Sequence, residues 1–251
     1  MNARMLRYGA IGLVAFVIGL VAFLPARVAA GWAEQMAPVS LGGVTGTVFA
    51  GQASYASGPG GAVENLQWTL HPAALLIGRL SADIRIDSDI NGFSAEVSRS
   101  LFGATTLENV TGSASAGWLA KLGGYTFLPL SGDINVDIER AAFDDTLQFD
   151  ALSGQIRLGN TRWELLNPPV QLGQVTTALT NTEEGVQLTV VDSSGPLALD
   201  GQITIDNSRR YRMEAALRAR AGADQRLGSM LDQLGKADDE GWHRVREQGR
   251  L

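Results

Sequence analysis

The sequence predicts a mostly β protein: an N-terminal single transmembrane helix, then a curled antiparallel β-sheet or sandwich-like domain with a few short helices. Three observations predict it: an apolar run near the N-terminus, alternation of apolar and polar residues with a period of two, and a recurring strand pattern centred on glycine. Together they divide the chain into a membrane anchor at residues 1–30 and an exported β domain at residues 31–251.

The anchor is predicted from an uncharged run that follows Arg7 and ends at Pro25. At about 1.5 Å rise per residue, residues 8–24 cover roughly 25 Å, the lower limit for a helix that crosses a bilayer. Basic residues are more frequent before the run than after it, which places the N-terminus in the cytoplasm and the remaining chain across the membrane. The large side chains expected to face lipid are Tyr8, Ile11, Leu13, Val14, Phe16, Val17, Ile18, Leu20, Val21, Phe23 and Leu24.

The same run is alternatively a cleaved signal sequence. Small residues at 28–30 precede Gly31, as signal peptidase requires. The apolar length favours a retained anchor, and Trp32 supplies an aromatic side chain at the expected membrane interface. Both interpretations export the chain that follows Pro25.

Composition narrows the classes of function. The chain has no cysteine, which excludes disulfides, thiolate metal sites and a cysteine nucleophile. The formal net charge is −6, with the acidic excess in residues 31–206 and an arginine-rich segment in residues 207–251. An acidic body argues against nucleic acid as a partner, because phosphate binding requires a basic face.

Strands are predicted from an apolar residue, a spacer and a glycine, followed by alternating apolar positions. The pattern occurs six times, with its glycines at Gly46, Gly78, Gly112, Gly132, Gly154 and Gly201, a spacing too irregular for a strict solenoid. After Gly132, for example, Ile134, Val136 and Ile138 alternate with polar residues. Such strands have one dry face, which must be buried against a second sheet or by curling of the same sheet.

Turn and helix signals complete the prediction. Hairpin turns are expected at 91–92, an Asn-Gly pair, and at 181–185. Short helices are expected at 72–78, at 116–123 and from the N-cap Asp224 to Gly235, the last with Leu227, Met230, Leu231 and Leu234 on one face. The pair Pro168-Pro169 suggests a boundary between two sets of strands.

No catalytic, cofactor-binding or metal-binding residues are predicted. Residues 87–92 match the first half of a calcium loop, but its twelfth position is Ser98 instead of glutamate, so we interpret the segment as a polar hairpin turn, with a weak cation site as the alternative. The two histidines, His71 and His243, are far apart in the sequence. The paired acids are adjacent residues in predicted turns, which does not suit two carboxyl groups acting on one sugar.

The segment from Trp68 to Leu80, WTLHPAALLIGRL, resembles the type II secretion system protein N family, also called general secretion pathway protein N. Three further features agree: the N-terminal anchor, the early strand at 46–53, and the ending at 211–251. Phe49 stands where the family leads us to expect tryptophan. The resemblance covers nearly the whole chain. It implies a single-pass cell inner-membrane protein with a periplasmic β domain and no known catalytic residues. It also implies other type II secretion components as partners, namely inner-membrane and secretin proteins.

The leading hypothesis is therefore a non-enzymatic accessory component of the secretion apparatus, which acts by protein–protein interaction and needs no cofactor. Candidate interaction or family-motif positions are Trp68, Leu70, His71, Pro72, Gly78, Arg79 and Trp242. The alternative, suggested by similarity to AsmA-like and bridge-like proteins, is a β-groove that binds or transfers lipid. An exported hydrolase is the third hypothesis, for which no arrangement of nucleophile or acid pair is present.

Overall fold

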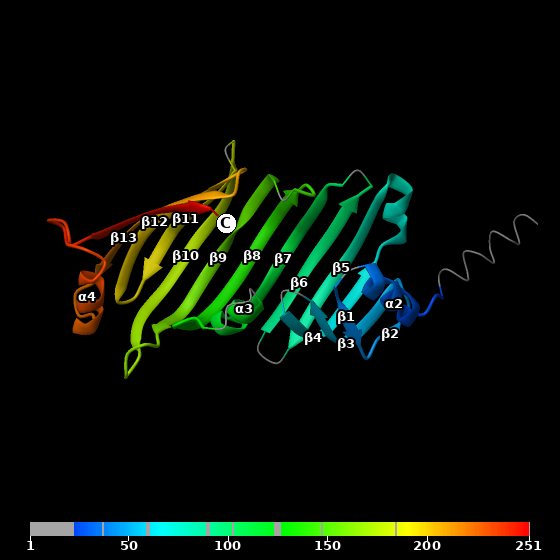
Figure 1. Cartoon of the computed structure of the whole chain (residues 1–251), viewed down its shortest axis with the longest axis horizontal. Helices are drawn as coiled ribbons and strands as arrows, with labels where there is room; N and C mark the ends of the chain where they lie inside the picture. Colours follow the sequence, from blue (N-terminus) through cyan, green and yellow to red (C-terminus); the bar gives the residue numbers. More distant parts are fainter. Residues whose placement is uncertain are drawn as a thin grey trace, which may run out of the picture.

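In the computed structural model, the strands of the described residues form a single open antiparallel sheet of fourteen strands (Figure 1). The structure describes residues 23–36, 38–58, 61–88, 91–101, 103–122, 127–146, 148–183 and 185–250. The mostly β, antiparallel prediction is confirmed. The sandwich-like form is wrong for the described residues, since all of their strands belong to this one sheet.

The strands follow the chain in order and most are 8 to 15 residues long. They are β1 (Ser40–Gly42), β2 (Thr45–Gly46), β3 (Ala50–Gly58), β4 (Gly61–Leu70), β5 (Arg79–Ser88), β6 (Asn91–Ser100), β7 (Thr105–Ser115), β8 (Leu130–Phe143), β9 (Phe149–Trp163), β10 (Val170–Thr182), β11 (Gly185–Ser194), β12 (Leu197–Asp206), β13 (Arg210–Ala219) and β14 (His243–Arg250). The helices are α2 (Ala26–Met36), the 3-10 helix η1 (Pro72–Ile77), α3 (Ala116–Leu122) and α4 (Gln225–Asp232).

The topology is a meander. From β3 to β14 each strand pairs with the next strand in the sequence, while β1 and β2 both pair with β3. The sheet therefore has a short, interrupted edge at β1 and β2 and a regular edge at β14. Figure 1 shows how it twists along its length, so that the last strands run at a different angle from the first.

Cross-strand register gathers the apolar side chains on one face. Val136 of β8 lies opposite Gly112 of β7 and Ile156 of β9. The same alignment extends along the sheet through Leu66, Ile86 and Phe93 on one side, and through Leu188, Ile203 and Met213 on the other. These side chains are only partly buried, whereas Asp133, Asn135, Asp137, Gln155 and Arg157 on the opposite face are exposed. We call the two surfaces the apolar face and the polar face.

Two clusters of buried residues lie within the apolar side of the sheet. Ala141, Leu152, Leu179 and Val186 form the central cluster. At the C-terminal end, Leu227 and Leu231 of α4 pack with Val170 and Leu197. The predicted N-cap is confirmed, because the Asp224 side chain accepts a hydrogen bond from the Arg226 amide. All three predicted helices are present, and in α3 Trp118 stacks on Phe93 with ring centroids 5.9 Å apart.

Two local predictions are wrong. Asn91 and Gly92 belong to β6, where Asn91 pairs with Ser88, instead of forming the hairpin turn. The Asn91 side chain is buried and accepts a hydrogen bond from the Ser115 amide at 3.0 Å, which holds it inside the sheet. Pro168-Pro169 is not a boundary either, because β9 and β10 pair directly across it, with Val170 opposite Trp163.

The start of the described chain is fastened to the sheet. The amide of Val48 donates to the Leu24 carbonyl at 3.0 Å, and Pro25 forms a bridge with Thr47. Helix α2 passes through the predicted division at residue 30, with Ala26 and Ala30 both buried. Residues 8–22 of the predicted anchor lie outside the described residues, and no helix in the described ranges is long and apolar enough to span a membrane.

Candidate interaction surfaces

The described residues contain no cluster of side chains that could hold a metal ion. No group of three or more His, Asp and Glu side chains converges there. Asp87 and Asn91, which belong to the partial calcium motif, point to opposite faces of the sheet, since Asp87 lies opposite Gly92 and Asn91 opposite Ser88. His71 contacts Asp83 at 3.0 Å on the surface, and His243 is buried with its Nδ1 2.8 Å from the Gly235 carbonyl.

Several acidic side chains hold turns in place. Hydrogen bonds from Arg226 lower the pKa of Asp224 to about 2. The pKa of Asp144 is lowered chiefly by the Thr146 hydroxyl, that of Asp206 by the Arg210 amide, and that of Asp238 by the Trp242 amide. Each is a partly or fully exposed carboxylate that accepts hydrogen bonds from residues two to four positions later. It therefore stabilises a turn or helix start and stays ionised near neutral pH.

Most candidate residues of the segment from Trp68 to Leu80, which resembles the protein N family, lie together at one end of β4 and β5. The Trp68 indole donates to the Val48 carbonyl at 3.0 Å, and its ring covers Gly51, where a Cβ would lie 2.5 Å from the ring. The Leu70 amide donates to the Phe49 carbonyl at 2.7 Å. These contacts tie β4 to the loop before β3, which in turn holds the start of the described chain.

The second half of that segment forms the turn into β5. His71 and Pro72 begin η1, and Gly78 ends it with a left-handed φ of 72°. Arg79 is exposed at the start of β5. Trp242 lies at the other end of the sheet, before β14, where the Arg218 guanidinium stands 4.5 Å from its ring. The structure therefore brings six of the seven candidate positions together and separates Trp242 from them.

An exposed apolar surface surrounds η1, and sequence reasoning missed it. We call it the η1 tip. It consists of Leu75, Leu76, Ile77, Leu80 and Leu101, which are exposed by 51%, 89%, 73%, 47% and 76%. Leu101, from the connection after β6, joins the others because its amide donates to the Gly78 carbonyl at 3.1 Å. In the sequence these residues resemble an ordinary buried helix face, and only their lack of cover in the described structure distinguishes them.

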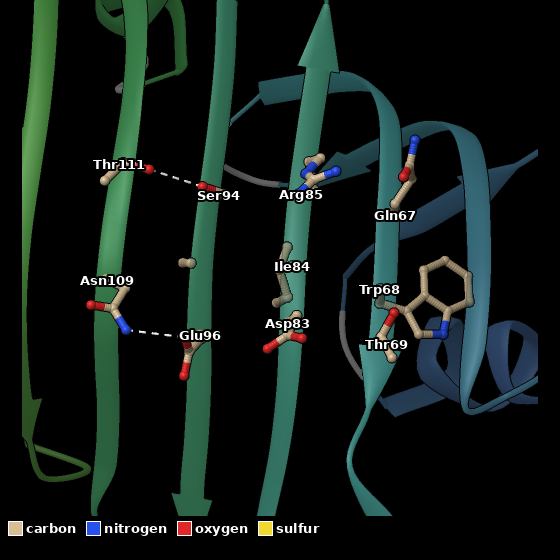
Figure 2. A pocket seen from close by; sticks show the side chains of 11 residues that line it. Gln67, Trp68, Thr69, Asp83, Ile84, Arg85, Ser94, Glu96, Asn109 and Thr111 are labelled. Atoms are coloured by element: carbon tan, nitrogen blue, oxygen red, sulfur yellow. Dashed lines mark hydrogen bonds between the residues drawn. The ribbon is translucent and has the colours of Figure 1, made fainter.

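The polar face carries a hollow of about 460 Å³ across β4, β5, β6 and β7. Figure 2 shows Gln67, Arg85, Ser94 and Thr111 aligned across these strands, with a second polar row below them. Ser94 and Thr111 share a hydrogen bond of 2.9 Å, and Asn109 donates to Glu96 at 3.0 Å. The hollow mixes both signs of charge and is open to solvent. The sequence did not reveal it because its residues are spread over four strands.

The β14 edge is the regular end of the sheet. Its pairing with β13 runs from Arg210 opposite Arg250 to Leu217 opposite His243 without a register shift. Arg244, Arg246 and Arg250 alternate along β14 and therefore point to the polar face. Arg244 contacts Asp238 at 3.1 Å and Arg246 contacts Glu214 at 3.7 Å. The arginine-rich C-terminal segment seen in the sequence is thus largely an edge strand and its neighbour.

Comparison with known proteins agrees with the resemblance seen in the sequence. The family model described as "Type II secretion system (T2SS), protein N" matches residues 37–246. The type II secretion system protein N of Vibrio cholerae serotype O1 is 25% identical over 258 aligned positions, which cover 99% of each chain. No solved structure matches. The protein therefore belongs to the type II secretion system protein N family.

Proposed function

We propose that this protein is an inner-membrane-anchored accessory component of the type II secretion system, which supports export of folded periplasmic proteins across the outer membrane by non-catalytic protein–protein contacts. Family membership supports the assignment to the secretion system. The observation that supports action through protein–protein contacts is the β14 edge, a long regular strand at the end of the sheet.

The two edges of the sheet are built differently. At the N-terminal edge the outer strands are three and two residues long, and α2 packs beside them. Short and covered edge strands prevent pairing with other chains. At the C-terminal edge β14 offers eight residues without a bulge. Such an edge is suited to accept an additional strand from a partner.

Charge indicates what kind of strand would bind. The polar side of β14 presents three arginines, so a partner strand with acidic residues at alternate positions would be favoured. Antiparallel pairing of two copies centred on Glu247 would instead place Arg244 opposite Arg250 of the other copy. Like charges directly opposite each other are destabilising, so an acidic strand from another secretion component fits better than a second copy.

The experiment is a secretion assay with charge reversal at the edge. We expect Arg246→Glu to reduce export of type II substrates. Arg140→Glu is the matched control, because Arg140 also forms an exposed ion pair, 3.5 Å from Glu108, but lies in the middle of the sheet. If deleting the gene leaves every type II substrate secreted normally and the secretin at its usual level, the accessory role is wrong. Equal export by the two variants would refute only the role of the edge.

A retained N-terminal anchor is part of this proposal. Cleavage after Ala30 would cut α2 and remove the buried Ala26 and Ala30 from their contacts, together with the Leu24–Val48 hydrogen bond. We expect mass spectrometry of the protein isolated from membranes to show an N-terminus upstream of residue 24. A mature chain that begins at Gly31 would disprove the anchor.

Lipid binding on the apolar face is the second candidate function. The observation that favours it is the apolar row that crosses β4 to β13 while remaining partly exposed. A surface of this kind on a single open sheet suits acyl chains. We expect the gently purified protein to carry phospholipid, as measured by native mass spectrometry, and a lipid-free spectrum would count against this function.

Two double variants, one on each face of the same two strands, provide a control for the lipid measurement. Val136 and Ile156 face each other on the apolar face, while Asn135 and Arg157 face each other on the polar face of the same two strands. Replacing the first pair by serine should lower the bound lipid, and replacing the second pair by serine should leave it unchanged. Equal loss in both variants would indicate a general effect on the sheet.

A further inference from the structure

We propose that the η1 tip is a second membrane contact, which dips into the headgroup and upper acyl region of the membrane that holds the N-terminal anchor. This inference rests on the anchoring proposed above. It adds a site on the folded domain and an orientation of the sheet, neither of which follows from a flexible tether alone.

The composition of the tip suits a lipid interface. Leu76, Ile77 and Leu101 each expose more than 70% of their surface, which is unusual for three large aliphatic side chains in one place on a soluble surface. The segment 72–80 contains no acidic residue, and Arg79 is exposed beside these side chains. Arg99 lies opposite Leu80 but forms an ion pair with Asp145 at 2.7 Å, so Arg79 is the cation offered to lipid here. Leucine and isoleucine flanked by arginine are suited to partition into the interface of a membrane that contains anionic lipid.

The position of the η1 tip indicates that it contacts the same membrane that holds the N-terminal anchor. The chain leaves the predicted anchor at Leu24, which is hydrogen-bonded to Val48. Val48 accepts the Trp68 indole, and the neighbouring Phe49 accepts the Leu70 amide, immediately before η1. The start of the described chain and the tip therefore lie at the same end of β4. In Figure 1, α2 and the turquoise helix above it, η1, occupy the same side of the molecule.

The tip also continues into the apolar face. Leu80 is followed along β5 by Ala82, Ile84 and Ile86 on the same side of the strand. A tip placed in the outer leaflet would bring this end of the apolar face to the membrane surface. Leu165, also exposed, lies between β9 and β10 at the opposite end of the strands, because β8 begins beside Trp163. It should point away from the same membrane.

The absence of cysteine makes a direct test possible. The full-length chain carrying Leu76→Cys or Leu165→Cys is labelled with an environment-sensitive fluorophore and reconstituted into vesicles of phosphatidylethanolamine and phosphatidylglycerol. Flotation first establishes that the chain is membrane-bound. We expect the label at residue 76 to be quenched by nitroxide-labelled lipid and protected from iodide at least several-fold relative to residue 165. Equal iodide accessibility at the two positions would overturn the inference and leave the anchor intact.

A second comparison tests whether apolar insertion is the cause. A label at Leu101→Cys should be shielded from iodide in the native background and should become accessible when Leu76→Ser and Ile77→Ser are added. Both residues are so exposed that their replacement should leave the fold intact, which circular dichroism can check. A label at residue 101 that stays shielded would refute insertion by the tip. A full-length chain that does not float would refute both the anchor and this inference.

Discussion

At the scale of single residues, the glycines of the strand pattern serve two purposes. Gly46 and Gly78 adopt left-handed φ values of 88° and 72°. Gly112 and Gly154 have ordinary backbone angles but lie under close neighbours: the Phe93 ring covers Gly112, and a Cβ on Gly154 would lie 2.7 Å from the Cα of Ile138. The sequence shows only that glycine recurs at a fixed position of the strand pattern, whereas the reason at each position depends on the adjacent strand.

Gly154→Ala should therefore destabilise the sheet. A Cβ at this position would collide with backbone of β8, which cannot move as a side chain can, and overpacking of this kind costs about 1–3 kcal/mol. Urea unfolding of the full chain in mild detergent measures the change. Gly159→Ala in the same strand is the control, since its nearest atom would be 3.9 Å away. Equal midpoints for the two variants would contradict this account.

The lowered pKa of Asp224 predicts that the stability of the folded chain depends on pH. Its pKa is lowered to about 2 from an ordinary 3.8 by hydrogen bonds from Arg226. A carboxyl whose pKa is lower in the folded state stabilises that state above its unfolded pKa, and the contribution disappears as pH falls from about 4 to about 2. Asp224→Asn should therefore unfold more readily than the native chain near neutral pH and equally readily at the acid limit. A difference that does not change with pH would rule out the ionised pair as its source.

At the scale of elements, α4 shows how much a periodic pattern can establish. The spacing of Leu227, Met230, Leu231 and Leu234 correctly predicted a helix with an apolar face. The structure then divides that face, since Leu227 and Leu231 are fully buried while Leu234 is 51% exposed beyond the end of the helix. Burial depends on what lies against each side chain, which the helical period does not specify.

Leu227→Ala should cost about 2–5 kcal/mol, because it leaves a cavity among Val170, Leu197 and Leu231. Leu234→Ala removes the same number of atoms from a half-exposed position and should cost far less. Denaturant unfolding followed by tryptophan fluorescence compares the two. Similar losses of stability would mean that α4 does not pack as described.

Asn91, in contrast to α4, shows a local sequence pattern that gave a wrong prediction. An Asn-Gly pair is a strong hairpin signal, yet here it lies inside β6. The cross-strand hydrogen bond from the Ser115 amide satisfies the buried Asn91 side chain. A partner more than twenty residues away thus decided the register, and no local pattern contains that information.

At the scale of the whole molecule, the meander makes contacts mostly between neighbours in the sequence. The central cluster spans β8 to β11, and the C-terminal cluster links β10 and β12 to α4, so the two clusters share a strand but no residue. A sheet built in this way should open in parts, as repeat proteins do, because loss of one end removes few contacts from the other.

Hydrogen exchange tests this expectation. In the Leu227→Ala variant we expect faster exchange in α4 and in the parts of β10, β12 and β13 that pack against it, with exchange in β5, β6 and β7 close to that of the native chain. Uniform acceleration over all described strands would show that the sheet opens as one cooperative unit.

The candidate surfaces were less predictable than the fold. The sequence singled out the segment from Trp68 to Arg79 and the arginine-rich C-terminal segment. It did not show that Leu101 joins η1, that Gln67, Arg85, Ser94 and Thr111 form one polar row, or that the arginines alternate along an edge strand. Each of these juxtapositions depends on strand pairing between distant residues.

By itself, the sequence determined that the chain forms antiparallel strands with one dry face and one wet face, short helices at three places, and a family membership that points to secretion. Only the tertiary structure decided that all described strands join one open sheet, that β14 is its regular edge, and that the η1 tip lies at the same end of β4 as the start of the described chain. The physical reason is that side-chain periodicity is a local property of the backbone, whereas burial and edge position depend on which strands pair across the sheet.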